Sequence, residues 1–283
     1  LGQALNILEK FDLTKHDNIT RKHIIIEALR RSYRDRAAYL GDSDFENIPI
    51  DRLLDKNYAE GLALTIDIDH ATPSSELGSI DSADNLGTNT THFSVVDEDG
   101  NRVSATLSIN LPFGSGFVVK GTGIVLNNEM DDFTIKPLTA NSYGLVGYQA
   151  NIIHPGKRPL SSMTPTFVES NDRIGIIGTP GGSRIISMVL LAILDFVKGE
   201  LPESWVSFPR FHHQYIPDLV QYEMGGLSTN EKRQLVSKGH KLKEIKRKYG
   251  NMQAIMIWKN KNTSFVASDP RGEGSAKAIH LYK

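Results

Sequence analysis

The chain has 283 residues, 39% of them hydrophobic and 23% charged, which is typical of a globular protein with one large domain or two small ones. A formal net charge of -1 gives no global field to attract nucleic acid or an anionic membrane, so neither partner is expected. The absence of cysteine excludes disulfides, thiolate metal sites and cysteine nucleophiles. No segment reaches the roughly 20 apolar residues that a membrane span requires.

The first 62 residues have the pattern of helices. Residues 18–40 place Ile24, Ala28 and Leu29 at helical spacing and predict one long helix, with five arginines on its other faces. A second helix is expected from about residue 50 to 62. Residue 1 already lies inside an apolar pattern, so we expect the chain to be part of a longer protein, and a missing signal peptide carries no information.

Residues 63–89 lose this periodicity, and the stretches 71–75 and 78–88 within them are rich in Ser, Asp, Gly and Asn. Such a composition predicts an exposed linker. A flexible and accessible backbone is also what a processing site needs.

A β-hairpin is expected directly after the linker. Residues 92–97 and 102–110 flank an Asp-Gly pair at 99–100, a strong signal for a tight turn. A two-residue turn would place Thr90 opposite Ile109, and a slip of one residue would place it opposite Ser108 or Asn110. In each register the start of the first strand lies beside Ser108 and Asn110.

The remaining elements mix strands and helices. We expect a strand at residues 173–177, a glycine-rich turn at 178–182 and a helix from 183 to about 197. Ser228 and Glu231 form a capping box that opens another helix. Residues 252–258 and 263–268 predict a final strand pair. Hairpin connections favour an α+β fold over a doubly wound parallel sheet.

Thr90 is the first candidate for a catalytic residue. A threonine hydroxyl is a poor nucleophile unless a base lies beside it, and an N-terminal threonine carries one in its own α-amino group. This role requires that the peptide bond after Asn89 be broken. Without that cut, Thr90 and Thr91 are a plain threonine pair at the beginning of a strand.

Three further segments combine polar groups in suggestive ways. The turn at 178–182 presents backbone N–H groups at a helix N-terminus and could form an oxyanion hole. It could equally be a tight connection that merely needs glycine. A phosphate loop is disfavoured because no Gly-Lys-Ser/Thr follows. Residues 126–133 (LNNEMDDF) concentrate carboxylates and amides that suit a metal, a ligand ammonium or an acidic turn. Residues 157–165 (KRPLSSMTP) hold two hydroxyls between two prolines, as a loop between strands also would.

These segments together resemble one family. Residues 90–97 (TTHFSVVD), 126–133, 157–165 and 181–184 (GGSR) look like the small-subunit motifs of gamma-glutamyltranspeptidases. Residues 35–42 (DRAAYLGD) resemble the end of the family's large subunit. The resemblance covers essentially the whole chain, with the motifs in the family's order.

The resemblance implies a four-layer αββα sandwich, the fold of N-terminal-nucleophile hydrolases. Residues 1–89 would be the C-terminal part of the large subunit and residues 90–283 the small catalytic subunit. Autocatalytic cleavage between Asn89 and Thr90 would free Thr90 to take the γ-glutamyl group from glutathione or a related compound. Water or an amino acid or peptide acceptor would then receive that group.

The resemblance also implies the roles of individual residues. The oxyanion-hole amides would belong to Gly181 and Gly182. The substrate α-ammonium would be held by Asn110, Glu129 and Asp132, and the α-carboxylate by Ser161 and Ser162. Tyr143 would lie on a lid loop. No metal or cofactor is expected. The remainder of the large subunit is the expected protein partner, and the expected location is the periplasm or the exterior.

Two departures from the family pattern are visible. Ser108 stands where many members have a threonine beside the nucleophile, and its hydroxyl can still form the hydrogen bond. Most of the large subunit has no counterpart here, including the arginine that clamps the substrate α-carboxylate. Two alternatives remain open: a member acting on poly-γ-glutamate or cephalosporin side chains, and an uncleaved or inactive homologue with a binding role.

Overall fold

The computed structural model describes residues 1–78, 90–137, 139–261 and 263–279. These residues form two compact units, each assembled from three stretches of chain. The first unit comprises Leu1–Leu86, Glu129–Ser161 and Pro209–Arg247, and the second Gly87–Asn128, Ser162–Phe208 and Lys248–Lys283. Within the described part of the chain, no helix has the length and apolar character needed to cross a membrane.

The second unit contains a hairpin and a four-stranded antiparallel sheet. The hairpin is β1 (Thr90–Val96) with β2 (Arg102–Ser108). The sheet has the order β3 (Thr166–Glu169), β4 (Arg173–Gly178), β8 (Gln253–Trp258) and β9 (Thr263–Ser268). Two helices follow β4: α5 (Ile185–Lys198) and α6 (Pro202–Ser207). The predicted strand at 173–177, the helix after it and the final strand pair are confirmed.

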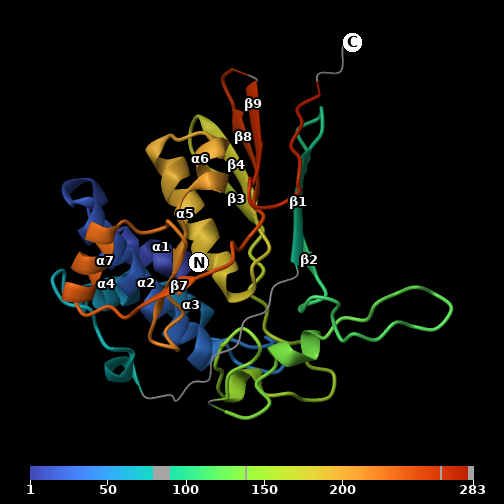
Figure 1. Cartoon of the computed structure of the whole chain (residues 1–283), viewed down its shortest axis with the longest axis horizontal. Helices are drawn as coiled ribbons and strands as arrows, with labels where there is room; N and C mark the ends of the chain where they lie inside the picture. Colours follow the sequence, from blue (N-terminus) through green and yellow to red (C-terminus); the bar gives the residue numbers. More distant parts are fainter. Residues whose placement is uncertain (79–89, 138, 262, 280–283) are drawn as a thin grey trace. The chain divides into compact units, whose positions relative to one another are not determined.

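Two glycines of β4 show which elements cover each face of the sheet. A Cβ on Gly175 would meet Phe196 of α5, whereas a Cβ on Gly178 would meet the ring of His92 on β1. Residues an odd number of positions apart in a strand point to opposite faces. The helices α5 and α6 therefore cover one face and the hairpin the other, which gives this unit a ββα layering (Figure 1).

The hairpin register differs by one residue from the arrangement with a two-residue turn. Thr90 lies opposite Ser108, and the loop between Asp97 and Asn101 has three residues. The Asp97 carboxylate accepts the backbone N–H groups of Asp99 and Asn101 at 3.0 and 2.8 Å, and Gly100 takes a φ of 84°. A three-residue loop with glycine in the left-handed region explains the shift, and the register is the predicted slip toward Ser108.

The first unit is mainly helical. Its helices are α1 (Gly2–Leu8), α2 (Asn18–Tyr39), α3 (Ile50–Leu54), α4 (Lys56–Leu64) and α7 (Thr229–Ser237), with short 3-10 turns at Leu13–Lys15, Ser74–Leu77, Glu129–Asp132 and Gln149–Asn151. A small sheet has the order β5 (Phe211–His212), β6 (Val220–Glu223) and β7 (Leu242–Ile245). The capping box of Ser228 and Glu231 opens α7 as predicted.

The long helix α2 confirms the prediction for residues 18–40 in extent but not in the placement of its arginines. Ile24, Ala28 and Leu29 are fully buried as expected. Arg30 and Arg31 are also buried, because the Glu27 carboxylate accepts from Arg30 Nε at 3.0 Å and from Arg31 Nη1 at 2.6 Å. Burial of charge is tolerated where it is paired in this way.

Two other predictions for this unit need correction. The helix expected at residues 50–62 is divided at Asp55, whose extended backbone ends α3 and whose side chain caps α4 by accepting from Tyr58 N. The linker expected at 71–75 and 78–88 is not exposed throughout, because Ser74 is buried. Asn89 and the rest of residues 79–89 lie outside the described part of the chain.

Candidate active site

Thr90 and Ser108 form the centre of the candidate site. They face each other across the start of β1 and the end of β2, with 3.1 Å between the Thr90 Oγ1 and Ser108 Oγ atoms. Ser108 Oγ also accepts the backbone N–H of Asn110 at 2.8 Å. A hydroxyl held in this way is positioned to orient the Thr90 oxygen by a hydrogen bond.

Asn110 is fixed just beyond the end of β2. It is 2% exposed and adopts a left-handed φ of 68°, a conformation that asparagine tolerates better than most residues. Its side-chain amide donates to the Asn128 carbonyl at 3.1 Å, and Asn128 Oδ1 accepts from Leu111 N at 3.0 Å. These bonds join the end of the nucleophile hairpin to the end of the segment 126–128.

The glycine-rich turn follows β4, at the end of the strand where β4 meets β1. Gly181 has a φ of 149° and Gly182 a φ of 58°, values that L-residues with a side chain rarely adopt. The Thr179 hydroxyl accepts the backbone N–H of Asn251 at 3.2 Å and anchors the turn to the segment before β8. The turn has the backbone conformation that a glycine pair allows, and its role as an oxyanion hole stays a prediction.

His92 connects the nucleophile strand to β4, a role that the sequence did not single out. Thr90 and His92 point to the same face of β1, since they are two positions apart. The His92 ring is 6% exposed, with Nδ1 2.8 Å from Thr106 Oγ1 and Nε2 3.0 Å from Ser94 Oγ. Burial lowers its pKa to about 4, so the ring is neutral at physiological pH. Gly178 has no side chain and so leaves room for this ring, and it was the signal in the sequence that could have indicated the contact.

Gly178→Ala should destabilise the second unit. Its Cβ would lie 2.1 to 2.5 Å from three ring atoms of His92, and such overpacking costs about 3 kcal/mol when neither side can move freely. We expect a melting temperature several degrees lower in calorimetry.

Gly61→Ala is the matched control for this substitution. Gly61 lies in α4, and a Cβ added to it would have no other heavy atom within 4 Å. The substitution should leave stability unchanged or raise it by roughly 0.5–1 kcal/mol, because alanine favours helix over glycine. Equal melting temperatures for both variants would contradict the contact between Gly178 and His92.

The acidic residues predicted to hold an ammonium lie on the 3-10 turn Glu129–Asp132 of the first unit. Burial, reinforced by the neighbouring Glu129 carboxylate, raises the pKa of Asp132 to about 7, while the Arg36 guanidinium opposes the rise. Asp132 Oδ1 accepts from Asn141 Nδ2 at 3.1 Å. A cationic ligand strongly stabilises the ionised form of a carboxylate buried in this way.

The other predicted binding residues are in loops. Tyr143, expected on a lid, is 7% exposed; its backbone N–H donates to Asn141 Oδ1 at 2.9 Å, and its carbonyl accepts from Gln214 Nε2 at 3.2 Å. Ser161 is exposed and Ser162 half-buried, in an extended stretch without helix or strand. Tyr143 is thus packed and hydrogen-bonded within the first unit.

The structure brings together part of the predicted site. Thr90, Ser108, Asn110, Ser162, Gly181 and Gly182 belong to the second unit, and Glu129, Asp132, Tyr143 and Ser161 to the first. The nucleophile group is established as a cluster by the contacts of Thr90, Ser108 and Asn110. The assembly of both groups around one substrate stays a prediction.

Comparison with known proteins gives consistent matches. A family profile described as Gamma-glutamyltranspeptidase matches residues 1–279. The glutathione hydrolase proenzyme of Escherichia coli K12 is 44% identical over 273 residues, which cover 95% of this chain and 47% of that protein. The chain therefore spans about half the length of the curated relatives it matches.

Solved structures support the same conclusion. A Helicobacter pylori gamma-glutamyltranspeptidase variant aligns with a TM-score of 0.62 at 44% identity, covering 64% of this chain and 100% of that one. The Bacillus halodurans cephalosporin acylase aligns with a TM-score of 0.81 at 24% identity over 99% of this chain and 49% of that one, and shows the fold alone. The predicted αββα fold class is confirmed, and the chain belongs to the gamma-glutamyltranspeptidase family.

Proposed function

We propose that the protein transfers γ-glutamyl groups from glutathione and related γ-glutamyl compounds to water or to amino acid and peptide acceptors, with Thr90 as nucleophile after a cut between Asn89 and Thr90. The observation that carries the proposal is the contact of Thr90 Oγ1 with Ser108 Oγ at the first residue of β1. The strand thus presents the hydroxyl of its own first residue to a second hydroxyl.

The proposed bond-making and bond-breaking steps use Thr90 and the turn at 178–182. The freed α-amino group of Thr90 accepts the hydroxyl proton while Oγ1 bonds to the γ-carbonyl carbon of the substrate. The backbone N–H groups of Gly181 and Gly182 stabilise the resulting oxyanion. The ammonium then returns the proton to the leaving amine, and a γ-glutamyl ester on Thr90 remains. Water or an acceptor amine attacks this ester and releases Thr90.

The relatives support the proposed cut. Those from Escherichia coli and Pseudomonas aeruginosa are named proenzymes. The whole of the Helicobacter pylori chain corresponds to 64% of this one. Residues 90–283 make up about 69% of the chain, so a separate small subunit fits that share.

The proposed substrate clamp pairs charges with their complements. Glu129, Asp132 and the side-chain amide of Asn110 would hold the α-ammonium, and the hydroxyls of Ser161 and Ser162 the α-carboxylate. The raised pKa of Asp132 supports this assignment, because a carboxylate disfavoured by burial is stabilised when an ammonium binds.

The proposed partner is the remainder of a large subunit, which would cover the outer face of the hairpin. Phe93, Val95, Val103 and Leu107 are 46 to 53% exposed on that face. A contiguous apolar strand face in contact with water favours a covering partner. We also propose that the protein acts in the periplasm or outside the cell, which fractionation of the source cells would test.

The alternatives have weaker support. The cephalosporin acylase shares the fold at 24% identity, whereas the glutathione hydrolase of Escherichia coli shares 44%. An inactive homologue would not need the Thr90–Ser108 pair or two glycines with left-handed φ values. Turnover of poly-γ-glutamate without release of p-nitroaniline from a γ-glutamyl anilide would favour the polymer as substrate.

Intact mass of the purified protein tests the proposal directly. Two fragments, ending at Asn89 and beginning at Thr90, are expected together with release of p-nitroaniline from the γ-glutamyl anilide. Active protein that remains a single uncut chain would disprove the role of Thr90.

Ser108→Ala should slow both the cut and the turnover. It removes the hydroxyl 3.1 Å from Thr90 Oγ1, and a hydrogen bond to a group that becomes charged is worth roughly a 10–100-fold change in rate. Ser108→Thr keeps the hydroxyl and should retain most of the activity. Stopped time courses on denaturing gels measure the cut, and unchanged rates in the alanine variant would contradict this role.

A further inference from the structure

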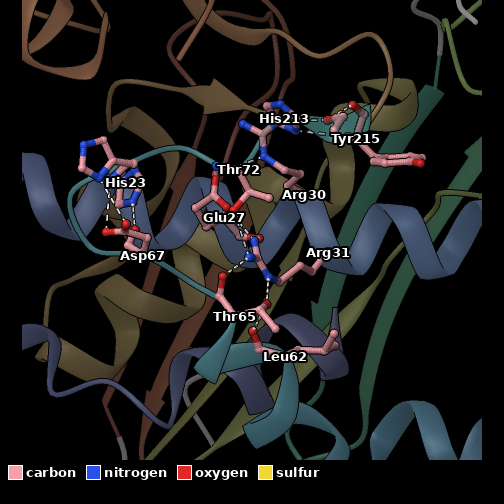
Figure 2. Close-up of polar contacts among 12 residues, drawn as sticks. His23, Glu27, Arg30, Arg31, Leu62, Thr65, Asp67, Thr72, His213 and Tyr215 are labelled. Carbon is pink, nitrogen blue, oxygen red and sulfur yellow. Dashed lines mark hydrogen bonds and ion pairs between the residues drawn. The ribbon is translucent and has the colours of Figure 1, made fainter. Parts of the chain in front are cut away.

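The first unit contains a buried polar cluster around α2 that the proposed chemistry does not use. It contains three histidines, two arginines and two carboxylates: His23, Glu27, Arg30, Arg31, His213, Asp218 and His240. Figure 2 shows the contacts that Glu27 makes with the arginines and His23 makes with Asp67. All but Asp218 are at most 3% exposed.

A metal site is the first possibility for this cluster, since donor atoms of His23, Glu27 and His240 lie within 4.8 Å of one another. The two carboxylate oxygens of Glu27, however, already accept from Arg30 and Arg31. The His23 Nδ1 and His240 Nε2 atoms are 2.8 Å apart, less than the roughly 3.3 Å between two nitrogens on a tetrahedral zinc ion. The histidine contact is therefore a hydrogen bond.

The partners of each ring fix its tautomer. His23 Nε2 lies 2.8 Å from the Asp67 carbonyl oxygen, which can only accept, so this nitrogen carries the proton. A neutral His23 then has a bare Nδ1 that accepts from His240 Nε2. The remaining nitrogen of His240, Nδ1, is bare and faces Arg30 Nη2 at 3.4 Å, which can only donate.

Both rings must be neutral for this chain of hydrogen bonds to exist. A proton on His23 Nδ1 would point at the N–H of His240, and a proton on His240 Nδ1 would point at the Arg30 guanidinium. Burial lowers the pKa of His23 and lowers that of His240 to about 2. The charged and titratable groups that face the pair are Glu27 and Arg30 on α2, Lys238 at the end of α7, and His213 and Asp218 after β5.

The histidine pair also crosses the position of the proposed cut. His23, Arg30 and Asp67 precede residue 90, whereas His240 follows it. Other contacts in the unit cross the same position: Ser74 Oγ donates to the Tyr215 carbonyl at 2.7 Å, and Asn18 Nδ2 donates to Glu231 Oε1 at 2.7 Å. After a cut, these bonds would join two separate chains within one unit.

We propose that the His23–His240 pair is an acid-sensitive latch between the two products of the cut, which holds residues 1–89 on residues 90–283 while both rings are neutral. The proposal rests on the proposed cleavage after Asn89. Separation of the fragments exposes both rings to water, where they take up protons below pH ~6.5. The affinity between the fragments is therefore highest above that pH. Below it the dissociation constant rises progressively, by about tenfold per pH unit for each histidine.

His240→Gln tests the latch in the cut protein. A glutamine amide keeps a donor near the position of Nε2 but does not titrate. Between pH 6 and 5, the dissociation constant of the two fragments, measured by size exclusion and native mass spectrometry, should rise about tenfold less in this variant than in the wild type. His154→Gln replaces an exposed histidine in the same unit and should match the wild type.

A second measurement does not depend on the cut. In uncut Thr90→Ala protein, ring-nitrogen chemical shifts at pH 6 should report both rings as neutral with the proton on Nε2. An equal rise of the dissociation constant between pH 6 and 5 in the wild type and in His240→Gln would overturn the latch, and so would a protonated ring at pH 6. A wild-type chain that is never cut refutes the proposed function instead, and the ring nitrogens still decide whether the neutral pair exists.

Discussion

Thr90→Ala should remain a single chain of 283 residues and should lose γ-glutamyl transfer by on the order of 10⁴-fold or more. The methyl group of alanine cannot attack a carbonyl, so neither the bond after Asn89 nor the substrate amide can be opened through residue 90. Intact mass and the release of p-nitroaniline measure the two losses separately.

Thr90→Ser is the matched control. It keeps the hydroxyl opposite Ser108 and should be cut and active at a reduced rate, because the β-methyl group that restricts the χ1 rotamer is gone. Cutting that persists in Thr90→Ala would mean that an external protease does the processing. Turnover that persists would exclude Thr90 as nucleophile.

Asp132→Asn should separate substrate binding from stability. The amide is isosteric but cannot pair its charge with the substrate ammonium, so we expect KM for a γ-glutamyl substrate to rise roughly a hundredfold. The fold should gain stability at pH 8, because the pKa of Asp132 is raised to about 7 by burial and its ionisation opposes folding.

The raised pKa of Asp132 also determines how the stability of the wild type changes with pH. A carboxyl group whose folded pKa lies above its unfolded value destabilises the fold as the pH rises from about 4 through 7. Calorimetry should therefore show a smaller loss of stability across this range in the asparagine variant. Substrate affinity of the wild type should increase as Asp132 ionises near pH 7. A KM that does not change in Asp132→Asn would exclude this residue from the clamp.

The sequence predicted those parts of the fold that depend on local patterns. The apolar spacing of α2, the capping box of Ser228 and the turn at 178–182 lead directly to the observed elements. The pairing of Thr90 with Ser108 was one of three registers, because strand alternation alone does not determine the length of a hairpin loop.

Tertiary contacts explain what the sequence could not predict. Arg30 and Arg31 are buried because Glu27 lies three and four positions before them and other segments close over the group. His92 became visible as a connecting residue only when Gly178 was placed against its ring. Which side chains meet across distant segments depends on packing that no local pattern encodes.

The hairpin of the second unit inverts the usual arrangement of a strand pair, since Ser104 and His92 face β4 while Phe93 and Leu107 face outward. The hairpin therefore contributes mainly polar side chains to its contact with the sheet, while the buried apolar side chains of the unit lie mainly on β4 and α5. Selection can consequently alter the hydroxyl-bearing strands, and with them the chemistry, at little cost to the hydrophobic core.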